Sequence, residues 1–153
     1  MKLSHVDPAG RARMVDVGDK PVSVRTAVAA GAIRMSRDAF QLVADQTVAK
    51  GDVLAVSEVA GTLAAKRTAE LIPLCHPLGL GHVEVEASLD AGLPGVRIRA
   101  AVKAVGRTGV EMEALTAVSV ALLTVYDMVK AADAAMVIVD VHLVEKQKAP
   151  LDT

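Results

Sequence analysis

The sequence has almost no aromatic residues and a single cysteine. Phe40 and Tyr126 are its only aromatic rings apart from histidine, tryptophan is absent, and Cys75 stands alone among 153 residues. One cysteine excludes an internal disulfide framework. The scarcity of aromatic rings leaves few surfaces on which bases could stack, which disfavours a protein that binds single-stranded nucleic acid.

An excess of charge of one sign is also missing. The chain has 17 Lys and Arg against 18 Asp and Glu, a formal net charge of -1, and no run of like charge. We therefore expect neither nucleic acid nor an anionic membrane as a partner. The N-terminus has no apolar h-region and no apolar stretch reaches about 18 residues, so we expect a soluble, cytoplasmic protein that does not span a membrane.

The sequence is instead rich in small aliphatic residues. Its hydrophobic fraction is 52%, and much of that is Ala and Val. Such a core buries little apolar area per residue, so we expect self-association to hide further surface. The length fits one domain, residues 1–153, with an N-terminal arm (1–21) and a tail (147–153) at its ends.

Two elements are predicted in the first third of the chain. Residues 22–36 are rich in β-branched side chains and predict a strand, with Gly31 at a bend or a bulge. Ser36 is the predicted N-cap of a short helix that ends near Asp45.

A longer helix is predicted between Asp52, its N-cap, and Pro73, its stop. Gly61 inside it either weakens the helix modestly or lets another backbone come close. The apolar residues of this helix recur at a helical spacing, at positions 53, 56, 59, 60, 63, 64 and 71.

Two strands joined by a turn are predicted at 83–90 and 96–105. Apolar and charged residues alternate in both, which is the period of a half-buried strand. The link AGLPG, residues 91–95, has hairpin length, so the strands should pair antiparallel. Four charged side chains then share the solvent face: Glu84, Glu86, Arg97 and Arg99.

The remaining elements are a long helix and a last strand. Thr108 and Glu111 form a capping-box pattern that predicts a helix over 109–132. The last strand covers 136–146; its predicted inward residues are Val137, Val139, Val141 and Leu143, and its outward ones Asp140 and His142. This order of elements predicts an α+β fold, a ferredoxin-like antiparallel sheet with helices packed on one face, plus one extra helix.

Cys75 and His76 lie next to each other in a segment stiffened by proline. Pro77 biases His76 toward extended backbone, in which neighbours point to opposite sides, so a direct Cys-His dyad is not expected. We expect Cys75 to pack inward and His76 to face outward as an acid, a base or a phosphate donor. Lys66 and Arg67 have a structural alternative, because cations stabilise the C-terminal end of a helix.

The long helix has candidate residues near both ends. At 100° per residue, Glu113, Asp127 and Lys130 fall on one stripe. Glu113 and Asp127 are about 21 Å apart along the axis, so two chains must combine if both serve one small-molecule site. The alternative is a local ion pair between Asp127 and Lys130. Arg107 and the free N-H groups at the helix start are a further candidate for binding phosphate.

Four blocks, AAKRT, LIPLCHPL, TGVEMEALTA and YDMVK, resemble the MoaC family of molybdenum cofactor biosynthesis, and the likeness extends from SHVDPAGRARMVDV to MVIVDVHLVEK. The resemblance implies a lyase that converts 3',8-cyclo-7,8-dihydroguanosine 5'-triphosphate to cyclic pyranopterin monophosphate and releases pyrophosphate. It also implies a homo-oligomer, a hexamer built as a trimer of dimers, with active sites between protomers.

The resemblance assigns roles to individual positions. The catalytic set is Asp127, Lys130 and Lys66. The substrate-binding set is Leu74, Cys75, His76, Met112, Glu113, Arg25, Lys50 and Arg67. Mg2+ is expected with the triphosphate, held by phosphate oxygens and water, and we assign no protein metal ligand and no tightly bound cofactor.

Two hypotheses follow from these roles. Lys130, kept reactive by partial burial and by Asp127, would exchange protons with the substrate as its ring rearranges. His76, Arg25 and Lys66 would hold the phosphate chain while a ribose-derived hydroxyl displaces pyrophosphate.

Two departures from the family pattern stand out. Val129 occupies a position that is often Cys, which should change only packing, and the tail QKAPLDT lacks the usual Gly- and Lys-rich ending, which bears on any C-terminal phosphate contact. Two other functions stay open on the residues alone. One is a non-catalytic ferredoxin-like oligomer that binds nucleotides for regulation. The other is a structural assembly in which the charged helix stripe mates with its copy.

Overall fold

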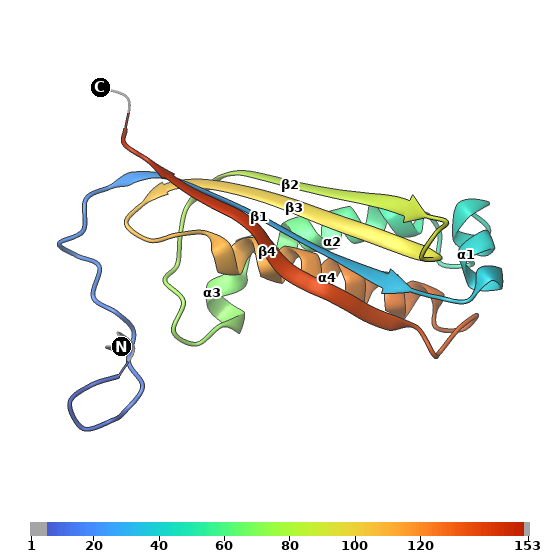
Figure 1. Ribbon diagram of the computed structural model, residues 1–153, viewed down its shortest axis with the longest axis horizontal. Helices are drawn as coiled ribbons and strands as arrows, with labels where there is room; N and C mark the ends of the chain where they lie inside the picture. The colour runs from blue at the N-terminus through green and yellow to red at the C-terminus, as the bar shows by residue number, and fades with distance from the viewer. Residues whose placement is uncertain (1–5, 152–153) are drawn as a thin grey trace.

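The computed structural model describes residues 6–151 and shows a four-stranded antiparallel sheet with helices on one side (Figure 1). The strand order β2-β3-β1-β4 is that of a ferredoxin-like sheet, so the predicted α+β fold is confirmed. The elements are β1 (Ser23–Arg34), α1 (Arg37–Ala44), α2 (Val53–Lys66), α3 (Thr68–Leu71), β2 (Leu80–Asp90), β3 (Gly95–Gly106), α4 (Glu111–Val129) and β4 (Val137–Ala149).

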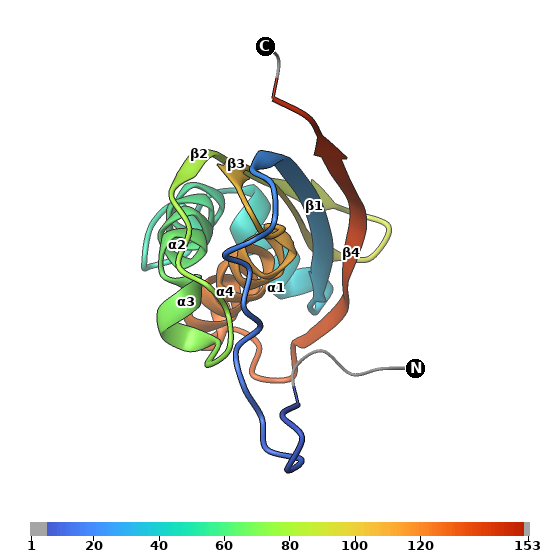
Figure 2. The ribbon, with the colours of Figure 1, turned by 90° about the vertical axis from the view of Figure 1, so that its left-hand side faces the viewer.

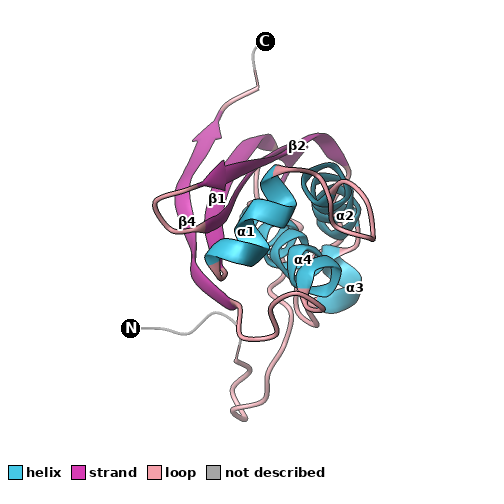
Figure 3. Cartoon of the chain, turned by 90° about the vertical axis from the view of Figure 1, so that its right-hand side faces the viewer, coloured by secondary structure: helices cyan, strands magenta, loops and turns pink. Residues whose placement is uncertain are grey.

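The helices cover one face of the sheet, and α2 and α4 pack against each other beneath it (Figures 1 and 3). The layer between is filled by small aliphatic side chains, of which Ile33, Ile98 and Leu122 are the largest fully buried ones. A Cβ atom on Gly61 would lie 2.9 Å from the carbonyl oxygen of Ala117 in α4. Gly61 therefore lets the two helix backbones approach closely, the second of the roles predicted for it.

Two of the predicted caps, Ser36 and Asp52, and the predicted hairpin are confirmed. The Ser36 hydroxyl accepts the N-H of Ala39 (3.2 Å), and the Asp52 carboxylate accepts the N-H of Ala55 (3.0 Å). β2 and β3 pair antiparallel, with Glu86 opposite Arg99 on the open face.

The second predicted helix is broken into α2 and α3. Arg67 leaves the helical conformation at φ -112, and the Thr68 hydroxyl donates to the last carbonyls of α2, those of Ala64 and Ala65. The apolar spacing identified the buried face only in part: Val53 and Ala64 are buried as the spacing implies, but Gly61 is the residue that contacts α4. The larger apolar residues Val56, Val59, Leu63 and Leu71 are 44%, 61%, 48% and 56% exposed.

The last strand differs from its prediction because its pairing with β1 shifts register twice, between Val28 and Ala29 and between Ala30 and Ala32. The pairing of β1 with β4 shifts at Gly31, as predicted for that residue, and Asp140 takes a left-handed conformation (φ 55) opposite it. The extra residue reverses the alternation, so Ile138 packs against the core. Of the residues predicted to face inward, Leu143 does pack against the core, whereas Val137 and Val141 are 43% and 38% exposed.

α4 is shorter at both ends than predicted. Its N-cap is Val110 and no side chain caps it, so the predicted capping box of Thr108 and Glu111 is wrong. The Glu111 carboxylate instead pairs with Lys146 of β4 at 3.2 Å. By length and composition alone, α4 is long and apolar enough to cross a membrane. However, 56% of its apolar 18-residue stretch is buried within this fold.

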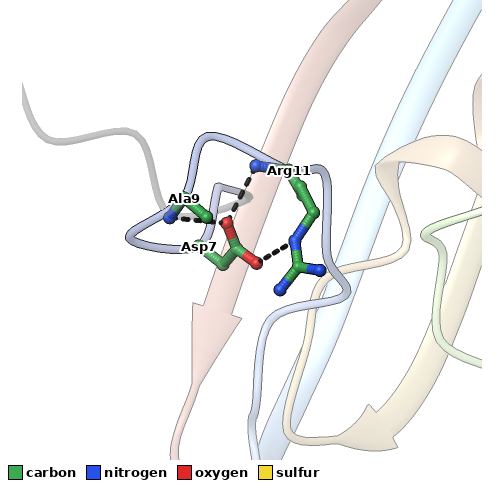
Figure 4. A network of polar contacts seen from close by, with 3 residues as sticks. All are labelled: Asp7, Ala9 and Arg11. Carbon is green, nitrogen blue, oxygen red and sulfur yellow. Dashed lines mark hydrogen bonds and ion pairs between the residues drawn. The ribbon is translucent and has the colours of Figure 1, made fainter.

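The N-terminal arm extends from the end of the molecule where α4 begins (Figure 2). Its tip is a turn between Val6 and Ala12, which form an antiparallel bridge. The Asp7 carboxylate ties this turn, because it accepts the N-H groups of Ala9 (2.9 Å) and Arg11 (2.8 Å) and the Arg11 side chain (2.9 Å; Figure 4). At the other terminus β4 runs on to residue 149, into the segment predicted as the tail, and residues 1–5 and 152–153 lie outside the described part.

Candidate functional site

The predicted site residues fall into two groups at opposite ends of α4. Since an α-helix rises 1.5 Å per residue, Glu113 and Asp127 lie about 21 Å apart along it. One chain therefore does not bring them together. The group at the start of α4 comprises Leu74, Cys75, His76, Met112, Glu113, Arg25, Lys66 and Arg67, and the group at its end comprises Lys50, Asp127 and Lys130.

Cys75 points toward α4, where it meets a carboxyl group. Its Sγ lies 3.7 Å from Oε1 of Glu113, a side chain in a residue only 3% exposed. The second oxygen, Oε2, has no hydrogen-bond partner within residues 6–151. Burial, helped by the neighbouring Glu113, raises the pKa of Cys75 to about 11, and burial also raises the pKa of Glu113. The thiol is thus a protonated donor at neutral pH, and Glu113 is suited to accept and hold a proton.

His76 is half-buried rather than free, because the N-terminal arm covers it. Its Nε2 lies 2.7 Å from the carbonyl oxygen of Val15. A carbonyl only accepts hydrogen bonds, so Nε2 carries the proton and donates it, which leaves Nδ1 available to another partner. His76 was expected to be exposed on the side opposite Cys75, but it is half-buried and lines the same hollow as Cys75, and its ring already binds a distant segment of the chain.

A hollow of about 420 Å³ opens beside these residues, and two smaller ones flank it. Leu74, Cys75, His76 and Met112 line the main hollow, together with Val15 and Lys20 of the arm. A hollow of about 140 Å³ contacts Lys66, Arg67 and Glu113, and one of about 180 Å³ contacts Arg25, Lys146 and Lys148.

The start of α4 is suited to an anionic ligand. No side chain of residues 6–151 caps its first N-H groups, so within this part of the chain the positive end of the helix dipole is open. Arg25 donates to the carbonyl of Arg107 (3.3 Å), but its Nε is buried and without a partner in the described chain. Cations of the arm, β1, the end of α2 and β4 thus surround the uncapped N-H groups at the start of α4. This combination fits a phosphate chain.

The group at the end of α4 is a salt-bridged cluster on the surface. The Asp127 carboxylate lies 2.7 Å from Nζ of Lys130 and 2.7 Å from Nζ of Lys50. Lys130 and then Lys50 lower the pKa of Asp127 to about 2, and Asp127 raises the pKa of Lys130. The side chain of Lys130 is 54% exposed, so its predicted partial burial is wrong for the single chain. At neutral pH the cluster holds one carboxylate and two ammonium groups.

Several residues near the start of α4 escaped the sequence prediction. Lys20 and Val15 were assigned to an arm without a role, and Glu111 to a cap. Lys146 and Lys148 stand on β4, where their alternation in EKQK was the available signal.

A larger hollow, about 600 Å³, lies on the open face of the sheet. Arg97 and Arg99 line it, but Glu86 and Asp140 offset their charge, and Arg97 is already paired with Asp90 at 2.5 Å. None of the predicted site residues reaches it. Size alone therefore does not identify the site, and the hollows around the start of α4 have the more suitable chemistry.

Comparisons with known proteins show the family to which the chain belongs. A family model described as "MoaC family" matches residues 14–149. A cyclic pyranopterin monophosphate synthase of Cereibacter sphaeroides is 56% identical over 145 residues, 95% of this chain and 91% of that protein. Proteins of the same name are 57% identical in Dinoroseobacter shibae (94% of this chain, 91% of that protein) and 58% identical in Methylobacterium sp. strain 4-46 (94% and 90%).

Proposed function

The chain belongs to the MoaC family, and from that premise we propose that it is a cyclic pyranopterin monophosphate synthase of molybdenum cofactor biosynthesis. It converts 3',8-cyclo-7,8-dihydroguanosine 5'-triphosphate to cyclic pyranopterin monophosphate and releases pyrophosphate. The observation that carries this assignment from the relatives to this chain is the placement of phosphate-binding groups around the start of α4 and of proton-transferring groups at its end.

The start of α4 is proposed to bind the triphosphate. Arg25, Lys66 and His76 supply the charged and polar donors, and the uncapped N-H groups of α4 add to them. When a substrate hydroxyl attacks the α-phosphorus, the bond to pyrophosphate breaks and negative charge builds on the leaving group. Cations held at that point stabilise the transition state more than the ground state.

The end of α4 is proposed to transfer protons during ring rearrangement. Lys130 is a cation that Asp127 holds in place, so it starts as a proton donor and becomes a base after it has given its proton away. Burial against a second chain would lower its pKa toward neutrality, which a proton-exchanging lysine requires.

A homo-oligomer is proposed because each chain offers two separated parts of one site. The apolar stripe of α2, including Val56, Val59 and Leu63, is exposed and fits burial against a second copy. A hexamer built from three dimers would place the start of one α4 near the end of another. Mixing inactive His76→Ala and Asp127→Asn chains, after dissociation and reassembly, should then restore about one site in four. No recovery would show that each site lies within one chain.

No dedicated protein metal site is proposed. Within residues 6–151, no group of three or more His, Cys, Asp or Glu side chains is placed to hold a metal ion. Mg2+ is proposed to enter with the triphosphate, coordinated mainly by phosphate oxygens and water. We place the enzyme in the cytoplasm, where its nucleotide-derived substrate is made.

The decisive experiment is to incubate the purified protein with the cyclic dihydro-GTP intermediate and Mg2+. Formation of cyclic pyranopterin monophosphate with one pyrophosphate per product is the expected result. Tight binding of the intermediate without pyrophosphate release would favour a regulatory nucleotide-binding oligomer instead. If Asp127→Asn dissociated the oligomer, the cluster would have an assembly role.

A further inference from the structure

The arm segment from Met14 to Lys20 has no regular structure. Hydrogen bonds nevertheless hold it at two points near the start of α4. His76 donates to the carbonyl of Val15 at 2.7 Å, 61 residues away in sequence. Arg107 donates to the carbonyl of Lys20 at 2.7 Å and to that of Gly18. Side chains from the body, rather than the arm itself, therefore determine where this segment lies.

The segment is also internally shaped between these two points. The Asp16 carboxylate accepts the N-H of Gly18 (2.8 Å), and the N-H of Lys20 donates to the carbonyl of Val17 (3.1 Å). Val15 and Val17 are half-buried and line the 420 Å³ hollow, whereas Asp16 between them is exposed. This alternation makes the segment an outer wall of the hollow.

Lys20 is the last residue of this segment and carries a positive charge. It lines the hollow, and within residues 6–151 no ion pair engages its Nζ. The acidic residue that lines the same hollow, Glu111 of α4, is already paired with Lys146. Arg107 connects this wall to the phosphate-binding side, because its own carbonyl accepts the Arg25 guanidinium at 3.3 Å.

We propose that residues 14–20 form a strap over the substrate hollow, that Lys20 is a further phosphate-binding residue on it, and that Arg107 is the positioning residue that holds the strap closed. The proposal rests on the proposed function for the identity of the substrate. His76 can serve both tasks only when its ring carries both protons, because Nε2–H holds the strap and a phosphate oxygen requires a second donor at Nδ1.

Lys20 is tested with Lys20→Met, which removes the charge, and Lys20→Arg, which restores it. Lys20→Met should raise the KM for the intermediate and weaken tripolyphosphate binding in calorimetry by roughly ten- to hundredfold, the factor expected for one charge-assisted hydrogen bond. The kcat should change less, and Lys20→Arg should recover most of the affinity. Arg13→Met, an exposed cation of the same arm outside the hollow, is the matched control and should behave as wild type.

Arg107 is tested by hydrogen exchange of the backbone amides of Gly18 and Lys20, which donate hydrogen bonds to the Asp16 carboxylate and to the Val17 carbonyl inside the segment. In Arg107→Met these amides should exchange faster than in wild type, and tripolyphosphate should protect them in wild type but less in the variant. Neither readout requires turnover, so a wild-type protein that fails to process the intermediate would refute the proposed function and leave this test intact. Wild-type affinity for tripolyphosphate in Lys20→Met, or unchanged exchange in Arg107→Met, would overturn the strap.

Discussion

Replacement of Glu113 by glutamine separates the contribution of this residue to stability from its contribution to function. Glu113 is 3% exposed, its Oε1 accepts only a weak bond from the Cys75 thiol, and its Oε2 has no partner in the described chain. Burial is the main cause that raises its pKa above the ordinary value of 4.5, and the nearby Glu111 adds to it. The folded protein therefore binds this proton more tightly than the unfolded chain does.

The sign of the pH dependence follows directly. Because the pKa of Glu113 is raised on folding, its stabilising contribution is fully present below pH 4.5. This contribution is lost as the pH rises through the folded-state pKa. Glu113→Gln cannot ionise, so it should escape that loss. At pH 8 its free energy of unfolding should exceed that of wild type by about 1–3 kcal/mol, the penalty for one buried polar group without a partner. Toward pH 4 the difference should vanish.

Urea denaturation followed by circular dichroism at several pH values measures this difference. For a chain of this length, 1 kcal/mol corresponds to about 2–4 °C in Tm, so thermal scans provide a second measurement. Glu84→Gln, an exposed carboxyl on β2, is the control and should stay within about 0.5 kcal/mol of wild type. A Glu113→Gln protein that is no more stable than wild type at pH 8 would refute the reasoning. The same variant should release pyrophosphate more slowly, because the proton-accepting group is gone.

Two further substitutions test the packing of α4 and the cluster at its end. Gly61→Ala should destabilise the fold by about 1–2 kcal/mol, because its Cβ would stand 2.9 Å from the backbone oxygen of Ala117 and overpacking outweighs the gain in helix propensity. Gly79→Ala, where a Cβ meets open space, is its control, and equal urea midpoints for the two variants would contradict this account. Asp127→Asn should keep the oligomer intact in size-exclusion chromatography and lower kcat by about 100-fold or more. Loss of the oligomer, or near-normal turnover, would show that the pair with Lys130 is structural.

The parts of the fold that the sequence predicted depend on local signals. Ser36 and Asp52 each cap a helix with their own side chain, and the AGLPG turn joins two strands of matching period. Such features need only a few neighbouring residues to form, and their residues can be recognised one segment at a time.

The parts that were wrong depend on residues far apart in the sequence. The bulge at Asp140 forms opposite Gly31 of a neighbouring strand, which no periodicity in β4 reveals. The predicted capping box does not form because Glu111 pairs with Lys146, 35 positions later in the sequence. The larger apolar residues of α2 are exposed because Gly61, and not a larger residue, packs on α4. Tertiary contacts outweighed local preference at each of these points.

The site was predictable in composition but not in arrangement. The resemblance supplied the residue identities, and helix geometry alone separated Glu113 from Asp127. What no pattern indicated was that the arm would return to His76, because Val15 precedes it by 61 positions and carries no polar side chain.

Three features of the isolated chain bear on assembly: an unpartnered buried oxygen on Glu113 and an exposed apolar stripe on α2, which are unfavourable by themselves, and the half-exposed ion pair of Asp127 and Lys130, which is not. Buried polar groups in folded proteins are nearly always satisfied, and exposed apolar stripes usually mark contact surfaces. Two of these features lie at the two ends of one helix, and the third lies on the helix packed beside it. A second copy that covers α2 and joins the two ends of α4 would account for all three, and the same contact would bury Lys130 and shift its pKa toward the range in which it can exchange protons.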